Sequence, residues 1–170
     1  MYRTMLCGVL LAGGLAMAQD DKTFVMNAAV GGMAEVELGK LAVQKASSES
    51  VKSFGQKMVD DHSKANDDLK SVASAQKIDV PVSLDTKHQA TIDRLSKLSG
   101  AAFDRAYIRE MVKDHDQDVM EFKKESQSGQ NSAVRDFAGK TLPTLQEHQR
   151  MIHNMSGGSM KSTSADRSKK

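Results

Sequence analysis

Histidines recur on the apolar faces of the long helical segments of this chain, and they are the residues best suited to chemistry. His62 and His115 lie in two segments with the same local pattern, separated by a constant offset of 115 − 62 = 53 residues. The matching pairs are Phe54/Tyr107, Met58/Met111, Val59/Val112, Asp61/Asp114 and His62/His115. Imidazole nitrogens buried between helices, together with one or two carboxylates, are the ligands of many Zn, Fe, Cu or Mn sites. The first hypothesis is therefore a transition-metal site, with the identity of the metal left open among these four.

The depth of each residue along its helix predicts which side chains meet. Glu35 precedes the turn at Ser47 by twelve residues, and His62 follows Ser48 by fourteen. At about 1.5 Å per residue they lie about 18 and 21 Å from the same end, so they are level. His115 falls near the middle of its helix. His148 is seventeen residues beyond Asn131, roughly one turn from the others. We expect Glu35, His62, His115 and His148 to be the metal ligands.

Four further side chains are expected to support this site. Asp61 and Asp114 each precede a histidine, and adjacent helical residues point about 100° apart. Each aspartate is therefore placed to orient a histidine of a neighbouring helix from outside the ligand set. Met58 and Met111 lie one turn before His62 and His115, and a thioether beside an imidazole would favour copper.

A structural interpretation remains open beside the metal site. Histidine on an apolar face often forms a core hydrogen bond, and methionine often fills gaps between helices. The alternative function is therefore that of a non-catalytic envelope or stress-related protein whose histidines are core groups. A small redox enzyme built on the same site is a third reading. The chain has no nucleophile elbow, phosphate loop or dinucleotide fingerprint, so no catalytic or organic-cofactor residue is assigned. Enzymatic activity is left open, with a non-enzymatic role favoured.

The elements that must position these residues are helices. The apolar positions recur at steps of three or four, no strand-like alternation competes, and Ser, Gly and Pro mark the breaks. The pattern predicts an all-α four-helix bundle with a short helical crossover between its second and third long helices. The expected helices are 24–46, 48–75, 85–98, 101–127 and 132–155.

Three local features qualify this prediction. Gly31 and Gly32 should weaken the first helix, and Pro143 should kink or split the last one. A row of small residues in the first helix, interrupted by Glu35, should let a neighbouring helix approach closely. The segment VRDFAGK (134–140) echoes VKSFGQK (51–57), which suggests that the two halves are a diverged duplication.

The ends of the chain predict export. Residues 1–18 combine Arg3, an apolar stretch and an A-x-A site at Ala16-Met17-Ala18, the features of a secretory signal peptide. The domain is expected at 19–155, followed by a disordered tail at 156–170. With 24 basic and 22 acidic residues, the chain has no basic excess that would indicate nucleic acid. We expect a periplasmic or outer-membrane-associated protein without a transmembrane segment, of open oligomeric state.

Four stretches carry a family resemblance. They are FVMNAAVGGMAEVELGKLA (24–42), VKSFGQKMVDDHSKAN (51–66), FDRAYIREMVKDH (103–115) and TLPTLQEHQRM (141–151). Together they resemble an exported bacterial family of ferritin-like four-helix bundles, labelled predicted outer-membrane protein and a domain of unknown function. The resemblance implies that fold in the bacterial envelope and no established activity. The segment MVKDH is also similar to Met/His helices of another exported bundle family linked to copper. Ferritin-like di-iron proteins carry Glu-x-x-His motifs, which this sequence lacks, so an oxygen-activating di-iron centre is not expected.

Overall fold

The computed structural model describes residues 12–166, with side chains described for 21–157. This part of the chain contains five α-helices and no β-strand. The helices are α1 (Ala12–Lys45), α2 (Glu49–Ala75), α3 (Thr86–Ser96), α4 (Gly100–Ser128) and α5 (Ser132–Asp166).

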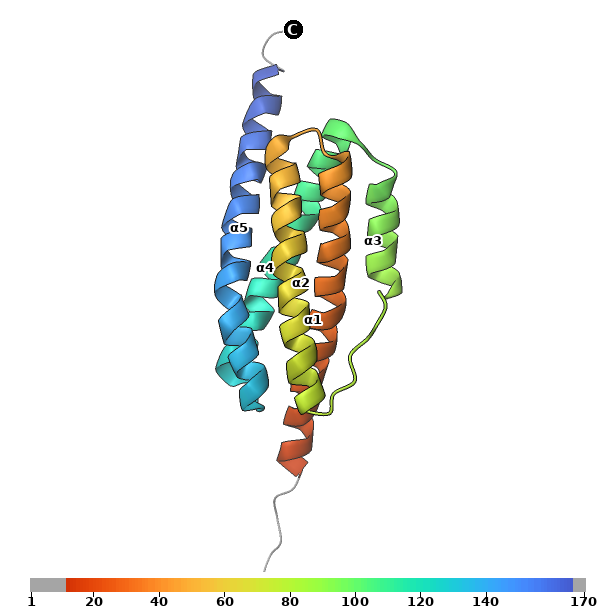
Figure 1. Cartoon of the computed structure of the whole chain (residues 1–170). Coiled ribbons are helices and arrows are strands. Elements are labelled where there is room, and N and C mark those ends of the chain that lie inside the picture. Colours follow the sequence, from red (N-terminus) through yellow and green to blue (C-terminus); the bar gives the residue numbers. More distant parts are fainter. Residues whose placement is uncertain (1–11, 167–170) are drawn as a thin grey trace, which may run out of the picture.

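Four long helices form a bundle, and the short helix α3 lies along its side (Figure 1). α1 and α2 form one antiparallel hairpin, α4 and α5 form the other, and the segment containing α3 crosses between them. Asp85 caps α3, because its side chain accepts a hydrogen bond from the His88 amide at 2.8 Å. The predicted four-helix bundle with a helical crossover is confirmed.

The core consists of two apolar clusters separated by a polar layer. The cluster near the α1–α2 loop includes Phe54, Met58, Phe103, Tyr107, Met111 and Ile152. The cluster toward the other end includes Phe24, Leu69, Phe122, Phe137 and Leu145. Between them along the four long helices, in order, lie Glu35, His62, His115 and His148, all buried. The candidate ligands therefore occupy one level at the middle of the bundle.

Small residues bring α1 and α2 into close contact, as the sequence predicted. A Cβ atom built on Gly39 would lie 2.6 Å from the carbonyl oxygen of Gly55, and one on Gly55 would lie 2.6 Å from the Cβ of Ala42. Such distances leave no room for a side chain. Gly32 is similarly covered by the side chain of Asn66.

The two hairpins match each other at a single offset. α1 ends at Lys45 and α4 at Ser128, while α2 begins at Glu49 and α5 at Ser132; both differences (128 − 45 and 132 − 49) are 83 residues. The echo of 51–57 in 134–140 has the same offset, 134 − 51 = 83. This agreement in helix bounds supports the duplication that the sequence suggested.

Two buried aspartates repeat at this offset and close opposite ends of the bundle. Asp104 accepts hydrogen bonds from the amides of Ser47 and Ser48 at 3.1 and 3.0 Å, and from the Ser47 hydroxyl. Asp21 accepts from the amides of Gln130 and Asn131 at 2.9 and 2.6 Å. The aspartate and the two amide donors of one cap are each shifted by 83 residues from those of the other, since 104 − 21, 130 − 47 and 131 − 48 all equal 83. Each hairpin therefore caps the turn of the other.

The helices extend beyond two predicted bounds. α1 begins at Ala12 and runs through Gly31 and Gly32, and α5 runs to Asp166 as one helix that contains Pro143. The prediction that Pro143 could split the last helix is wrong, and packing of both flanks against the core explains this, because Phe137, Leu145 and Ile152 are buried. The signal peptide, the domain bounds and the disordered tail stay predictions, and residues 1–11 and 167–170 lie outside the described residues.

Candidate metal centre

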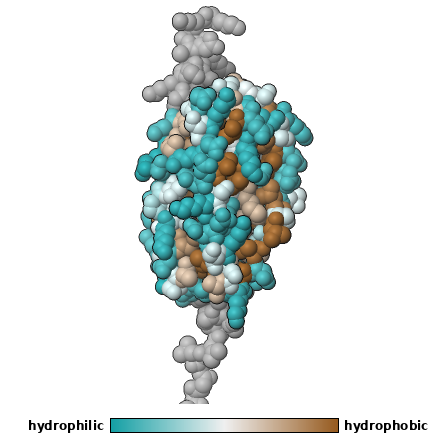
Figure 2. All heavy atoms as spheres, viewed as in Figure 1, coloured by the Kyte–Doolittle hydropathy of each residue, from teal (hydrophilic) through white to brown (hydrophobic). Residues whose placement is uncertain are grey.

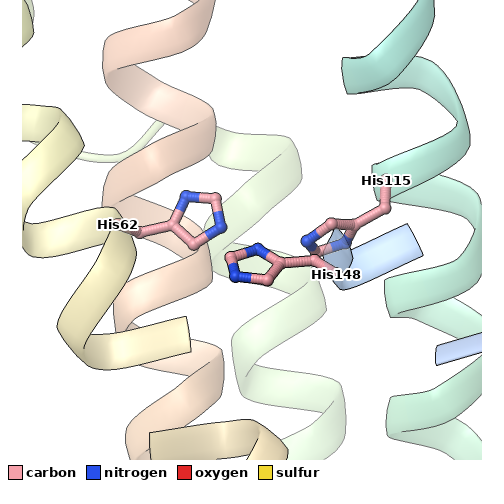
Figure 3. A group of neighbouring side chains, drawn as sticks. All are labelled: His62, His115 and His148. Carbon is pink, nitrogen blue, oxygen red and sulfur yellow. The ribbon is translucent and has the colours of Figure 1, made fainter. Parts of the chain in front are cut away.

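Three imidazoles converge at the polar layer of the bundle. His62 on α2, His115 on α4 and His148 on α5 point toward one another (Figure 3). Their ring centroids are 5.4 to 5.8 Å apart, and one nitrogen from each ring lies within 4.8 Å of the others. His148 is level with the other two, so the expected displacement of one turn is absent.

Hydrogen bonds fix which nitrogen of each ring carries the proton. His115 Nδ1 donates to the Met111 carbonyl oxygen at 3.0 Å, and His148 Nε2 donates to Asp61 Oδ2 at 2.8 Å. His62 Nδ1 lies 2.9 Å from Glu35 Oε2, a carboxylate acceptor. In a neutral imidazole the second nitrogen is then a lone pair. The acceptor nitrogens are His62 Nε2, His115 Nε2 and His148 Nδ1.

These three acceptor nitrogens are buried and have no hydrogen-bond partner among the described residues. Buried polar atoms in folded proteins nearly always have a partner, because an unmet lone pair forfeits its hydration without compensation. Burial also lowers the pKa of each of the three imidazoles to about 4. All three rings are therefore neutral near pH 7, which is the form that binds metals.

Glu35 is the carboxylate nearest to this cluster. Its Oε1 atom receives no amide, imidazole or hydroxyl donor and lies 3.6 Å from His115 Nε2, too long for a hydrogen bond. Burial raises the pKa of Glu35 to about 7, although His115 opposes the shift. A positive charge beside Glu35 would favour its ionised form.

The supporting residues divide into those that contact a ligand and those that do not. Asp61 binds a histidine of a neighbouring helix, as expected, and also pairs with Lys57 at 3.1 Å. Asp114 does not contact a candidate ligand. It lines a pocket at the side of the bundle, where burial raises its pKa to about 6. The expectation that Asp114 orients a core histidine finds no hydrogen bond to support it among the described residues. Met111 acts through its carbonyl oxygen, and the side chains of Met58 and Met111 belong to the apolar cluster above the histidines.

Asp118 is a site residue that the sequence analysis missed. Its carboxyl interacts with that of Glu35, and burial, together with the charge of Glu35, raises the pKa of Asp118 well above the usual value, which favours a proton shared between the two carboxyls. Two signals in the sequence point to it. Asp118 is three residues after His115, on the same helical face. It is also the duplicate of Glu35, because 118 − 35 = 83.

An aromatic side chain covers one face of the histidine cluster. The ring of Phe54 lies 6.0 and 6.1 Å from the rings of His115 and His148, and 6.3 Å from that of Tyr107. The Tyr107 hydroxyl is buried, and burial together with Glu35 raises its pKa. Within the apolar cluster that contains Tyr107, Phe54 is therefore the member that packs against the imidazoles of His115 and His148.

The geometry can accommodate a cation with small side-chain movements. A point equidistant from three atoms 4.8 Å apart is about 2.8 Å from each, and zinc–imidazole bonds are about 2.0–2.1 Å long. Each ring would therefore move inward by about 0.7 Å to reach bonding distance. With Glu35, the three nitrogens provide four donors from four different helices.

The fold and its polar layer define a class of helical-bundle protein, in which four long helices enclose a buried His/Glu cluster and a crossover helix joins two hairpins. Within that class, the chain belongs to the family described as domain of unknown function DUF4142, whose family model matches residues 11–155. A comparison with curated proteins found no match.

Solved structures of other helical proteins share this fold. A DUF305 fragment from Deinococcus radiodurans superposes with a TM-score of 0.70 at 14% identity, covering 81% of this chain and 95% of that one. A predicted secreted DUF305 protein from Streptomyces coelicolor gives 0.67 at 13%, covering 80% and 89%. A conserved hypothetical protein from Mycobacterium tuberculosis gives 0.62 at 14%, covering 83% and 93%.

Among the described residues, no helix is long and apolar enough to cross a bilayer. The face shown in Figure 2 is mostly hydrophilic, with hydrophobic residues in separate small patches.

Proposed function

We propose that this protein binds a transition-metal ion through Glu35, His62, His115 and His148. The observation that carries the proposal is the convergence of three buried lone pairs, on His62 Nε2, His115 Nε2 and His148 Nδ1, none of which has a donor. Hydrogen bonding in a purely structural core would place a donor among them. A cation supplies the missing positive partner to all three at once.

The donor set narrows the class of metal. Three imidazoles and a carboxylate suit zinc, copper or iron better than magnesium or calcium, which prefer oxygen ligands. If Glu35 binds as the fourth ligand, a tetrahedral site is filled, as in closed structural zinc sites. Such a site favours holding or buffering the ion in the bacterial envelope, where the signal-peptide features and the secreted structural relative would place the chain. The proposal covers both a free periplasmic protein and one that is attached to the outer membrane.

The test is metal content and cobalt spectroscopy on protein purified without a His tag or chelator. We expect about one ion per chain by mass spectrometry, and Co²⁺ should give the intense visible bands of a tetrahedral nitrogen site. His115→Ala and His148→Ala should each lower the affinity at least 100-fold, because each removes one ligand from a preformed cluster. His153→Ala is the matched control, since His153 is exposed and pairs with Asp116.

The structural alternative gives different results in the same experiment. A wild type that binds no Zn²⁺, Cu²⁺, Fe²⁺, Mn²⁺ or Co²⁺ and gains no thermal stability from them would contradict the proposal. The histidines would then be core groups of a non-catalytic bundle protein. Equal metal loss in His115→Ala and His153→Ala would place the ion elsewhere.

A further inference from the structure

A pocket of about 210 Å³ lies between α1, α3 and α4, beside the histidine cluster. We name it the α1–α4 pocket; five acidic residues line it, together with Lys87 and His88. The acidic residues are Glu35, Asp85, Asp114, Asp118 and Glu121. Burial raises the pKa values of Glu35 and Asp118, so the negative charge comes chiefly from Asp85, Asp114 and Glu121. These three acidic residues outnumber Lys87 and make the pocket attractive to cations.

The opposite side of the bundle has a larger but less acidic groove. It lies between α2 and α5, has a volume of about 640 Å³, and is lined by Asp61, Asp68 and Asp136 together with Lys64 and Lys140. Three acids against two lysines leave little net charge. No histidine and no part of Glu35 lines this groove.

The α1–α4 pocket adjoins an inner cavity that reaches the candidate ligands. This cavity, of about 30 Å³, is lined by Glu35 and His62, and it shares Gly31, Glu35 and Asp118 with the outer pocket. Its volume corresponds to about one water molecule, so an ion can pass only after shedding most of its hydration shell. A Cβ atom on Gly31 would meet no atom within 4 Å, so open space lies over this glycine.

Glu35 links the two cavities chemically. Its side chain is buried, with 4% of the residue exposed, and its Oε1 atom receives no amide, imidazole or hydroxyl donor. Its carboxyl neighbour Asp118 lines both cavities. Carboxyl oxygens that can bind a cation therefore line the route from the α1–α4 pocket to His62.

We propose that the α1–α4 pocket is the cation entrance to the histidine centre. Asp114, together with Asp118 once Asp118 has released its proton to solvent, holds a divalent ion before the ion passes Gly31 to His62. The proposal rests on metal binding at the histidine centre. The ion first exchanges water for carboxylate oxygen in the pocket. It then exchanges carboxylate oxygen for imidazole nitrogen at the histidine centre. The crossover helix α3 contributes Asp85 to the mouth, which gives this connection a part in metal uptake.

The test is the rate of Co²⁺ binding to the full metal-free chain, followed by stopped-flow absorbance. Asp114→Asn/Glu121→Gln should slow association about fivefold or more at low ionic strength, with a weaker salt dependence and an unchanged final spectrum. The matched control, Asp68→Asn/Asp136→Asn, removes the same charge from the opposite groove and should change the rate less than twofold.

A second variant tests the path from the pocket to His62 by narrowing it. Gly31→Leu should slow Co²⁺ binding and release by the same factor, because an obstruction alters both rates and leaves the equilibrium constant unchanged. Gly157→Leu is the control, since Gly157 is also helical with open space above it and lies away from the pocket.

The outcomes separate the two proposals. Unchanged rates in both the charge variant and Gly31→Leu, with normal cobalt binding, would overturn the entrance and leave the metal centre standing. Slower binding in the Asp68/Asp136 control alone would move the entrance to the α2–α5 groove. A wild type that binds no Co²⁺ would overturn both.

Discussion

At the scale of single residues, the site is defined by which nitrogen of each imidazole carries the proton. Each imidazole uses one nitrogen to donate to a fixed acceptor, and these acceptors are a carboxylate of α1, a carbonyl of α4 and a carboxylate of α2. This leaves the other nitrogen of each ring facing the centre. The types and depth of Glu35, His62 and His115 predicted their meeting from sequence. The tautomers of His62 and His148 could not be predicted, because their acceptors, Glu35 and Asp61, lie on other helices.

Asp61 provides a residue-scale prediction. Asp61→Asn keeps the shape of the side chain but removes the charge that stabilises the donor tautomer of His148. We expect metal affinity to fall about 10- to 100-fold, the usual effect of losing a carboxylate partner of a ligand histidine. A competition titration against a chromophoric chelator measures this change.

The neighbouring residue supplies the control for Asp61. Asp60→Asn removes the same charge from an exposed position whose partner is Gln56, so its affinity should match the wild type. An equal loss of affinity in both variants would mean that overall charge, and not the contact with His148, is responsible.

At the scale of elements, the closeness of α1 and α2 depends on two glycines. Gly39 faces the backbone of Gly55, so neither helix can yield to an added methyl group without moving apart. The small-residue row in the sequence predicted this contact. It did not reveal that Gly31, in the same helix, faces open space, because helical periodicity does not say which neighbour covers a given position.

The contrast between Gly39 and Gly31 is testable by denaturant unfolding of the metal-free chain. Gly39→Ala should lower the free energy of unfolding by about 2 kcal/mol, since overpacking outweighs the gain in helix propensity. Gly31→Ala should raise the free energy of unfolding by up to about 1 kcal/mol, because it gains propensity without a clash. A stabilised Gly39→Ala variant would show that α1 and α2 can separate without cost.

At the scale of the whole molecule, the hairpins depend on each other through Asp21 and Asp104. Composition and periodicity predicted the bundle and its crossover, and a short echo suggested the duplication. The reciprocal caps could not be read from the sequence, because each joins residues more than fifty positions apart. Asp118 escaped prediction for a related reason: its equivalence to Glu35 depends on the offset of 83 residues, and no local motif repeats around these two positions.

The caps make a prediction about cooperativity. Asp104→Ala leaves the buried amides of Ser47 and Ser48 without acceptors, and we expect a loss of about 3 kcal/mol in the free energy of unfolding. Asp21→Ala should cost a similar amount at the other end of the bundle. In each variant both hairpins should still unfold in one transition, detected by circular dichroism and by a fluorophore placed in either hairpin.

A control on the surface completes this test. Asp93→Ala, at an exposed position of α3, should change the stability by less than about 0.5 kcal/mol. Separate transitions for the two hairpins in Asp104→Ala would contradict the mutual dependence.

Two hairpins that cap each other's turns at a constant offset have the arrangement of a symmetric homodimer joined into one chain. At this offset Glu35 and Asp118 occupy equivalent positions, as do the two cap aspartates. The histidines have no such counterparts, since the offset pairs His62 with Leu145, His115 with Gly32 and His148 with Ala65. The caps and the carboxyl pair therefore follow the twofold pattern of the bundle, whereas the imidazole cluster breaks it. Because His62 belongs to one hairpin and His115 and His148 to the other, neither hairpin alone contains the cluster.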